Sequence, residues 1–233
     1  MASEPQIVAL GGHGTTPEQT SSLMRHAVSL TGKESPRVLF VPTAVGDDDT
    51  RIVTFYELFA GLGRLSHLKF FPWPPADLRE LTLAQDAIYV SGGNTANMLA
   101  VWRVRGFDGI LREAWEAGVV LFGASAGMIC WFEAGVTDSF GPQLEGIRDG
   151  LGFLHGSACP HYDGEELRRP RYRELVAGGF PKGIAADDGV GLHYAGTELR
   201  EVVTCRPGAT AYHVTAAGEE RLDPRLLGGL ANA

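Results

Sequence analysis

The stretch LFGASAGMICWF, residues 121–132, places one serine at the centre of small residues, between two apolar runs. The run before it predicts a buried strand over 119–125, and the segment after it predicts a helix over 126–135. Gly123 and Gly127 lie two residues from Ser125 on either side, so the chain can turn sharply there and project the serine hydroxyl. A serine that only caps the following helix would fit the same short motif.

The same alternation of apolar runs and helix-like segments covers the first half of the chain. Near-continuous Val, Ile, Leu and Phe runs are typical of parallel strands that are covered on both faces. We therefore predict an α/β fold, with a doubly wound, mainly parallel sheet sandwiched by helices, in a single domain over 1–233. The predicted strands are 6–12, 37–44, 68–73, 87–93 and 119–125, and the predicted helices are 15–30, 50–63, 96–104, 108–118 and 126–135. Residues 77–85 are expected to form a helix or a turn.

Two further features complete the predicted fold. Thr16 and Pro17 are expected to be the N-cap and the first residue of the first helix. Residues 197–222 alternate polar and apolar side chains and turn often, so we expect a short antiparallel part near the end of the chain.

The composition limits the classes of function. The chain has 233 residues, of which 44% are hydrophobic, and a net charge of -8, which argues against general affinity for nucleic acid or anionic membranes. No apolar run approaches the ~20 residues of a membrane span, and the opening MASEPQIVAL has no basic region followed by an apolar one. The three cysteines have no metal-like spacing and fit a reduced, cytoplasmic protein, in which Cys130 packs in the core.

A second glycine-rich turn follows the predicted strand over 87–93. The segment YVSGGNTANML, residues 89–99, ends that strand in Gly92-Gly93 and opens another helix. Adjacent strand ends would direct backbone donors into one crevice, so Gly93 and Ala126 are the predicted N–H donors to an oxyanion. Alone, this turn also fits a phosphate cradle or a simple cap. The loop GGHG at 11–14 does not match a dinucleotide fingerprint.

A serine nucleophile needs a base, and the chain has seven histidines. His161 is favoured because it follows a short apolar segment that ends in Pro160, which is another strand-end position. His26 and His67 are expected to be structural or surface residues, and His13 could line a site. The remaining candidates for the base are His155, His193 and His213.

The carboxylate that orients the base is expected after a short strand within 183–192. Asp187 and Asp188 both stand there, and Asp188 completes the favoured set with Ser125 and His161. Asp163 and Asp138 are weaker candidates, at a helix start and in a turn. An α/β-hydrolase runs in the order nucleophile, acid, histidine, and would require His193 or His213 as the base instead.

Four motifs in this order resemble the peptidase E family of serine peptidases, the S51 group, whose relatives include cyanophycinases. They are the glycine turn SGGNTANML at 91–99, the serine turn GASAGM at 123–128, PHYD at 160–163 with RPRYREL at 169–175, and the acidic turn AADDG at 185–189. Together they cover most of the chain. The resemblance implies a fold like that of class I glutamine amidotransferases and cleavage of dipeptides with an N-terminal aspartate.

The resemblance also implies a role for each matching residue. Ser125 would be the nucleophile, His161 the general base and Asp188 the orienting carboxylate, at a position where peptidase E has glutamate. Gly93 and Ala126 would supply the oxyanion N–H groups. Arg168 would bind the aspartate side chain of the substrate, since a guanidinium matches a carboxylate. The implied reaction needs no metal or organic cofactor, and the expected partner is a short peptide, with the protein a monomer or homodimer.

Three departures from the family pattern bear on specificity. Ser91 stands where the family has its first glycine, Ala124 replaces a bulky residue before the nucleophile, and the loop between His161 and Arg168 is shorter. Two other functions are therefore kept as alternatives: an esterase or amidase of the α/β-hydrolase type, and a non-catalytic homologue that binds a small molecule. A glutamine amidotransferase is excluded, because its nucleophile is cysteine.

Overall fold

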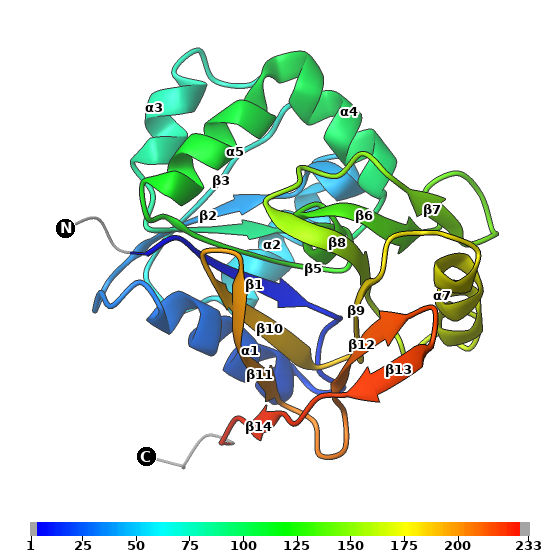
Figure 1. The fold of residues 1–233 in the computed structure, drawn as a ribbon. Coiled ribbons are helices and arrows are strands. Elements are labelled where there is room, and N and C mark those ends of the chain that lie inside the picture. The colour runs from blue at the N-terminus through cyan, green and yellow to red at the C-terminus, as the bar shows by residue number, and fades with distance from the viewer. Residues whose placement is uncertain (1–3, 229–233) are drawn as a thin grey trace.

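The computed structural model describes residues 4–228; residues 1–3 and 229–233 of the domain expected over 1–233 lie outside this range. Its larger sheet has eight strands in the order β14-β11-β10-β1-β5-β4-β2-β3 (Figure 1). The strands from β1 to β3 in this order are mutually parallel, whereas β10 is antiparallel to both β1 and β11. Their bounds are β1 Gln6–Leu10, β2 Arg37–Val41, β3 Arg64–His67, β4 Ala87–Val90, β5 Val120–Ala124, β10 Val190–Ala195, β11 Glu198–Thr204 and β14 Arg225–Leu226.

A second sheet of six strands, in the order β13-β12-β9-β8-β6-β7, is built from the later part of the chain. The neighbours β6, β8 and β9 are parallel, and the other pairs are antiparallel. The antiparallel part expected over 197–222 is thus divided between the two sheets. The bounds are β6 Phe132–Thr137, β7 Glu145–Ile147, β8 Leu154–Cys159, β9 Gly183–Ala186, β12 Ala211–Thr215 and β13 Gly218–Arg221.

Helices cover both faces of the larger sheet, because successive side chains of each strand point to opposite faces. Val8 and Leu10 of β1 pack with α1 (Pro17–Ser29) and α2 (Asp49–Leu58). Ile7 and Ala9 belong to a second core, which includes the helices α4 (Thr95–Arg105), α5 (Phe107–Glu116) and α6 (Ala126–Ile129) and side chains of the second sheet. The short helix α3 (Leu78–Leu83) contacts α5, and α7 (Arg168–Ala177) contacts β12. The predicted doubly wound α/β class is confirmed.

Two predicted elements differ from the structure. The strand expected over 68–73 is a loop that follows β3, because the backbone N–H groups of Phe70 and Phe71 donate to the Asp47 carboxylate rather than to a strand. Phe70 is still buried, at 5.1 Å between ring centroids from Phe107. The helix expected over 126–135 ends at Ile129, and the chain enters β6 at Phe132. Apolar periodicity alone does not separate short buried strands from helices.

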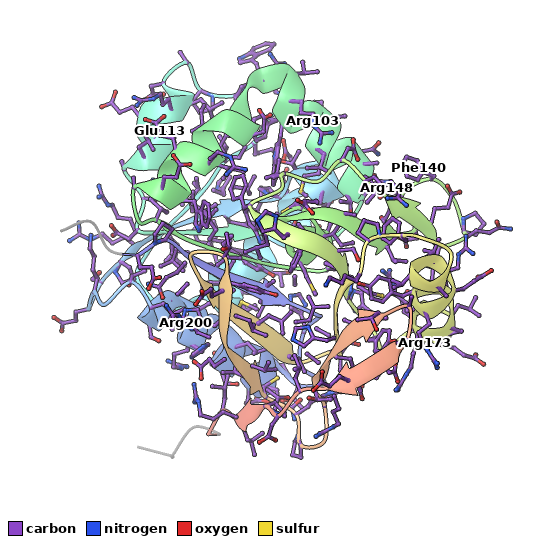
Figure 2. The ribbon with its side chains drawn as sticks, viewed as in Figure 1. Arg103, Glu113, Phe140, Arg148, Arg173 and Arg200 are labelled. Atoms are coloured by element: carbon purple, nitrogen blue, oxygen red, sulfur yellow. The ribbon has the colours of Figure 1, made fainter. Side chains whose placement is uncertain are left out.

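The surface carries many charged side chains together with some exposed apolar ones, such as Trp73 and Phe140. Charged side chains such as Arg103, Glu113, Arg148 and Arg200 lie around the outside of the molecule (Figure 2). Within residues 4–228, no helix combines the length and the apolar character that crossing a membrane requires.

Candidate active site

Ser125 sits at the carboxyl end of β5, where the chain turns into α6. Its backbone dihedrals are φ 58° and ψ -109°, an unusual conformation for a residue other than glycine. The Ser125 N–H donates to the Leu10 carbonyl at 3.1 Å, which holds the turn against the end of β1. Such a strained strand-to-helix turn projects the side chain out of the backbone, as the sequence predicted.

The two glycines that flank Ser125 are required by close backbone packing. A Cβ on Gly123 would lie 2.7 Å from the Gly127 carbonyl oxygen, and a Cβ on Gly127 would lie 2.4 Å from the Val90 carbonyl oxygen. Both distances are shorter than any ordinary contact. The small residues therefore let α6 pack directly on the ends of β4 and β5, and the helix N-terminus with its free N–H groups lies beside Ser125.

The Gly92-Gly93 turn lies next to the Ser125 turn, because β4 and β5 are parallel neighbours. A Cβ on Gly92 would be 3.8 Å from Ser125 Oγ. Gly93 has a φ of 133° and packs so closely on the Ala44 carbonyl that a Cβ would be 2.3 Å away. Within residues 4–228, the N–H groups of Gly93 and Ala126 donate no hydrogen bond to the protein, which leaves both available to a ligand.

His161 follows β8 and is held by the loops around it. Its N–H donates to the Gly11 carbonyl at 2.9 Å, and its φ of 54° lies in the left-handed region. Its Nδ1 atom is 2.6 Å from Asp188 Oδ1, a short charge-assisted hydrogen bond. Asp188 follows β9, and its N–H donates to the Asp163 carboxylate at 2.9 Å. Three loops, after β1, β8 and β9, thus position one histidine–carboxylate pair.

Two glycines leave the room that the Asp188 carboxylate occupies. A Cβ on Gly12 would lie 1.8 Å from Asp188 Oδ1 and 2.9 Å from His161 Nδ1. A Cβ on Gly164 would lie 2.2 Å from Asp188 Oδ2. Sequence reasoning treated the GGHG loop as a weak signal and did not assign Gly12 a role. The sequence signal for this role was the pair Gly11-Gly12 at the end of the first predicted strand.

Ser125 and His161 line the same cavity of about 320 Å³. The cavity also contains His13, whose Nε2 lies 3.0 Å from the hydroxyl of Tyr89. Burial raises the pKa of Tyr89, so the phenol stays neutral in this contact. The rest of the wall is largely apolar, with contributions from Phe40, Val45, Phe55 and Leu58. This volume lies at the lower end of the range for ligand sites, and suits a small substrate.

One cation lines this cavity among the described residues, and it is Arg51. Arg51 lies in the first turn of α2, is exposed, and forms no salt bridge within residues 4–228. Sequence reasoning missed it. The available signal was its place just after the loop that follows β2, because residues in such loops face the crevice of a doubly wound sheet.

Arg168 lies elsewhere in the structure. Only 3% of its surface is exposed, and its guanidinium binds Glu165 at 2.6 Å and the Val136 carbonyl at 3.0 Å. It is not among the residues that line the cavity with Ser125. The structure therefore does not bring Arg168 to Ser125 and His161, and its expected contact with the substrate stays a prediction.

The other candidate bases do not line this cavity either. His193 lies on β10, with Nε2 2.9 Å from Gln6 Oε1, and His213 lies on β12 in the second sheet. His155 contacts Glu133 at the surface. The arrangement therefore offers His161 to Ser125, rather than the histidine that an α/β-hydrolase order would require.

Cys130 follows α6 and is fully buried. Burial raises the pKa of its thiol well above the ordinary value, so the reactive thiolate is disfavoured. Its packing in the core agrees with the expectation from the sequence.

Two solved structures share this fold over nearly the whole chain. A peptidase from an acI-B1 Actinobacterium aligns with a TM-score of 0.69 at 18% identity, with 96% of each chain covered. A putative peptidase E protein from Listeria monocytogenes EGD-e aligns with a TM-score of 0.62 at 17% identity, with 95% of this chain and 100% of the other covered. At these identities the likeness establishes the class of fold, a mixed α/β protein.

Sequence similarity identifies the family. Residues 7–202 match the family model of peptidase family S51. The uncharacterized peptidase YgaJ of Bacillus subtilis (strain 168) is 49% identical over 218 residues, which are 92% of this chain and 94% of that protein. The chain therefore belongs to peptidase family S51, and the resemblance stated from its four motifs is confirmed.

Proposed function

We propose that the chain is a serine peptidase that hydrolyses short peptides through an acyl-enzyme on Ser125. The observation that carries this proposal is the pairing of His161 with Asp188 at 2.6 Å, in the cavity that His161 shares with Ser125. A histidine oriented by a carboxylate beside a serine on a strained turn is the arrangement of a catalytic triad.

The geometry suggests a role for each nitrogen of His161. The Nδ1–H group donates to Asp188, so the lone pair of the neutral imidazole is on Nε2. Nε2 takes the proton of Ser125 as the hydroxyl oxygen attacks the peptide carbonyl, and then gives that proton to the leaving amine. Water attacks the acyl-enzyme with the same base, which regenerates Ser125. Asp188 holds the imidazole in this tautomer and stabilises its cation.

The N–H groups of Gly93 and Ala126 are proposed to hold the oxyanion. Both lie at turns next to Ser125, and neither donates to an acceptor within residues 4–228. Donors that are already oriented stabilise the developing charge without reorganising during the reaction.

The substrate is proposed to carry a carboxylate, as a dipeptide with an N-terminal aspartate does. Arg51 supports this proposal, because it presents an exposed guanidinium without a salt bridge, within the described residues, to the cavity of Ser125. A planar guanidinium binds a carboxylate through two parallel hydrogen bonds. The cavity of about 320 Å³ favours a dipeptide over a longer chain.

The first experiment is hydrolysis of Asp-Leu by the purified protein and by its Ser125→Ala variant. We expect the variant to lose about 10⁴-fold or more in kcat, because the nucleophile is removed. Ser35→Ala, which changes an exposed serine outside the cavity, is the matched control and should retain full activity.

The outcomes separate the parts of the proposal. Cleavage that survives in Ser125→Ala would overturn the serine mechanism. If the native protein cleaves Ala-Leu but not Asp-Leu, the mechanism stands and the specificity for aspartate is rejected. If a panel of dipeptides and esters gives only ester hydrolysis, the esterase alternative is favoured.

A further inference from the structure

Three side chains with metal-binding atoms meet outside the cavity of Ser125. His26 lies in the last turn of α1, and His193 and Glu201 are cross-strand partners on β10 and β11. His26 Nε2 is 3.6 Å from Glu201 Oε1, and His193 Nδ1 is 3.8 Å from the same oxygen. The three atoms all lie within 4.8 Å of one another. Figure 1 shows α1 beside the antiparallel strands β10 and β11.

The hydrogen bond to Gln6 places the proton of a neutral His193 ring on Nε2, so Nδ1 carries the lone pair that faces Glu201. Gln6 donates its Nε2 to the Leu30 carbonyl at 3.4 Å, so its Oε1 is the acceptor for His193 Nε2–H at 2.9 Å. The proton on Nε2 leaves Nδ1 without one. In the neutral ring the Nδ1 lone pair therefore points towards a carboxylate oxygen, an unfavourable contact that either a proton on Nδ1 or a bound metal ion would relieve.

His26 also has a ring nitrogen that faces Glu201 without forming a hydrogen bond. Its Nε2 atom is buried and has no hydrogen-bond partner within the described residues. The 3.6 Å separation from Glu201 Oε1 is too long for a hydrogen bond. A buried polar atom without a partner is rare and requires an explanation, of which a bound ion is one.

We propose that His26, His193 and Glu201 bind a divalent transition metal ion, with zinc as the best fit. Zinc prefers imidazole nitrogen and carboxylate oxygen at about 2.0–2.2 Å in tetrahedral geometry, which separates the ligand atoms by roughly 3.3 Å. The distances from Glu201 Oε1 to His26 Nε2, 3.6 Å, and to His193 Nδ1, 3.8 Å, exceed this value by a few tenths of an ångström. Glu201 is about one-third exposed, so water can occupy the fourth position.

The surroundings agree with this assignment. Arg225 contacts both oxygens of Glu201, with its shorter bonds at 2.9 and 3.0 Å to Oε2. Oε1 keeps a lone pair towards the histidines, and Arg225 orients the carboxylate as outer hydrogen-bond donors do in metal sites.

The ion would join α1 to the antiparallel edge of the larger sheet. None of its ligands lines the cavity that contains Ser125. Its role is therefore structural and independent of the proposed catalytic mechanism. Metal binding to the folded state alone stabilises that state in proportion to the logarithm of the free metal concentration.

The test is zinc titration of the full chain after removal of metals with a chelator. Calorimetry should give one site per chain with micromolar or tighter affinity, and the midpoint of thermal unfolding should rise with zinc concentration. His26→Gln and His193→Gln should each weaken binding by at least tenfold. His155→Gln is the matched control, because His155 is an exposed histidine that also contacts a glutamate, Glu133, and its loss should not change the affinity.

Cobalt(II) absorption on the native chain keeps the test decisive if a variant fails to fold. A tetrahedral site of nitrogen and oxygen ligands gives intense visible bands, which zinc should abolish by displacement. Absence of zinc binding by the native chain would overturn the proposal. Equal affinity in the native chain, His26→Gln and His193→Gln would also overturn it, because the bound zinc would then lie elsewhere.

Discussion

At the scale of single residues, the candidate site depends on its glycines as much as on its reactive side chains. Ser125 occupies a strained conformation, and Gly123 and Gly127 beside it allow backbones to approach within contact distance. Gly12 and Gly164 play the same part for the Asp188 carboxylate. A single added methyl group at such a position is therefore a specific probe of the geometry proposed for catalysis.

Gly12→Ala should inactivate the protein without unfolding it. The new methyl group would take the place of Asp188 Oδ1, so the carboxylate must leave His161 Nδ1. We expect kcat for dipeptide hydrolysis to fall about 10²- to 10⁴-fold, as it does when a triad histidine loses its orienting partner. Steady-state kinetics measures this loss, and circular dichroism checks the fold.

Gly109→Ala is the matched control for Gly12→Ala. Gly109 lies in α5 without a positive φ, and apart from the backbone of that helix and the adjacent residues no heavy atom lies within 4 Å of an added Cβ. Its kinetics should be unchanged and its stability up to about 1 kcal/mol higher, because alanine favours helices over glycine. Full activity in Gly12→Ala would show that Asp188 does not orient His161.

Two arginines are candidates for the substrate carboxylate, and substitution separates them. Arg51→Gln should lower kcat/KM for Asp-Leu by about 10- to 100-fold, mainly through KM, because it removes a charged partner of the substrate. Hydrolysis of Ala-Leu should change by less than about twofold. The ratio of kcat/KM for the two dipeptides is the quantity to measure.

Arg168→Gln is expected to act on stability instead. Its guanidinium holds the buried Val136 carbonyl, and loss of that partner should cost about 1–3 kcal/mol in the free energy of unfolding. Selectivity for Asp-Leu should be retained. If Arg168→Gln loses this selectivity and Arg51→Gln keeps it, the assignment made from the sequence is the better one.

At the scale of elements, the ends of helices and strands build the site. The turn after β4 opens α4, and the turn after β5 opens α6, so two helix N-termini face one crevice. Asn94 caps α4 directly after Gly93. Its Oδ1 accepts from the Asn97 N–H at 2.8 Å, and its Nδ2 donates to the Ser139 carbonyl at 2.9 Å.

Asn94→Ala should therefore lower the free energy of unfolding by about 1–2 kcal/mol, because the cap and the link to Ser139 are lost together. Urea unfolding at 25 °C measures the change. Asn97→Ala alters the exposed first turn of the same helix and should cost nothing, since alanine is the stronger helix former. Equal losses in the two variants would contradict the capping role.

The helices and strands also show where a local sequence pattern was sufficient to predict the structure. Thr16 caps α1 and Pro17 begins it as predicted, because an N-cap and a proline act within one turn of helix. The strand predicted over 68–73 is wrong, and of the helix predicted over 126–135 only residues 126–129 are helical. Phe70 is buried beneath α5 rather than in a strand, and Phe132 pairs with a strand of a sheet that the sequence did not predict.

At the scale of the whole molecule, the two sheets share one hydrophobic core. Ile7 of the larger sheet belongs to the same cluster as Ala158 and Ile184 of the second sheet. The Asp187 carboxylate is buried near their junction, where Oδ2 accepts from the Thr210 N–H at 2.9 Å. Burial, and then repulsion by Asp163, raise the pKa of Asp187 to about 6.

This raised pKa makes stability depend on pH. The folded state binds the Asp187 proton more tightly than the unfolded state, so this group stabilises the fold at low pH, and its contribution is lost as the pH rises from about 4 to about 6. The pKa difference corresponds to about 3 kcal/mol in full, and to about 2 kcal/mol between pH 4.5 and 7.5.

The free energy of unfolding of Asp187→Asn should rise by about 2 kcal/mol relative to that of the native protein between pH 4.5 and 7.5. Asparagine keeps the hydrogen bond from the Thr210 N–H and cannot ionise. Urea unfolding of both proteins at pH 4.5 and 7.5 tests the expectation. Asp77→Asn, which alters an exposed carboxylate, should show no such pH-dependent difference. If the difference in unfolding free energy between Asp187→Asn and the native protein is the same at both pH values, the raised pKa of the Asp187 carboxyl group is contradicted.

Local sequence patterns were enough to predict the features that depend on a few neighbouring residues: the strand–turn–helix around Ser125, the glycine turn at Gly93 and the apolar runs of a parallel sheet. Their order along the chain was sufficient to indicate peptidase family S51. Three features became visible only in the folded chain: Gly12 makes room for Asp188, Arg51 lines the cavity, and Arg168 is buried and does not line it. The physical reason is that these contacts join loops far apart in the chain, whose meeting depends on sheet order and on packing, and neither is encoded in any local pattern.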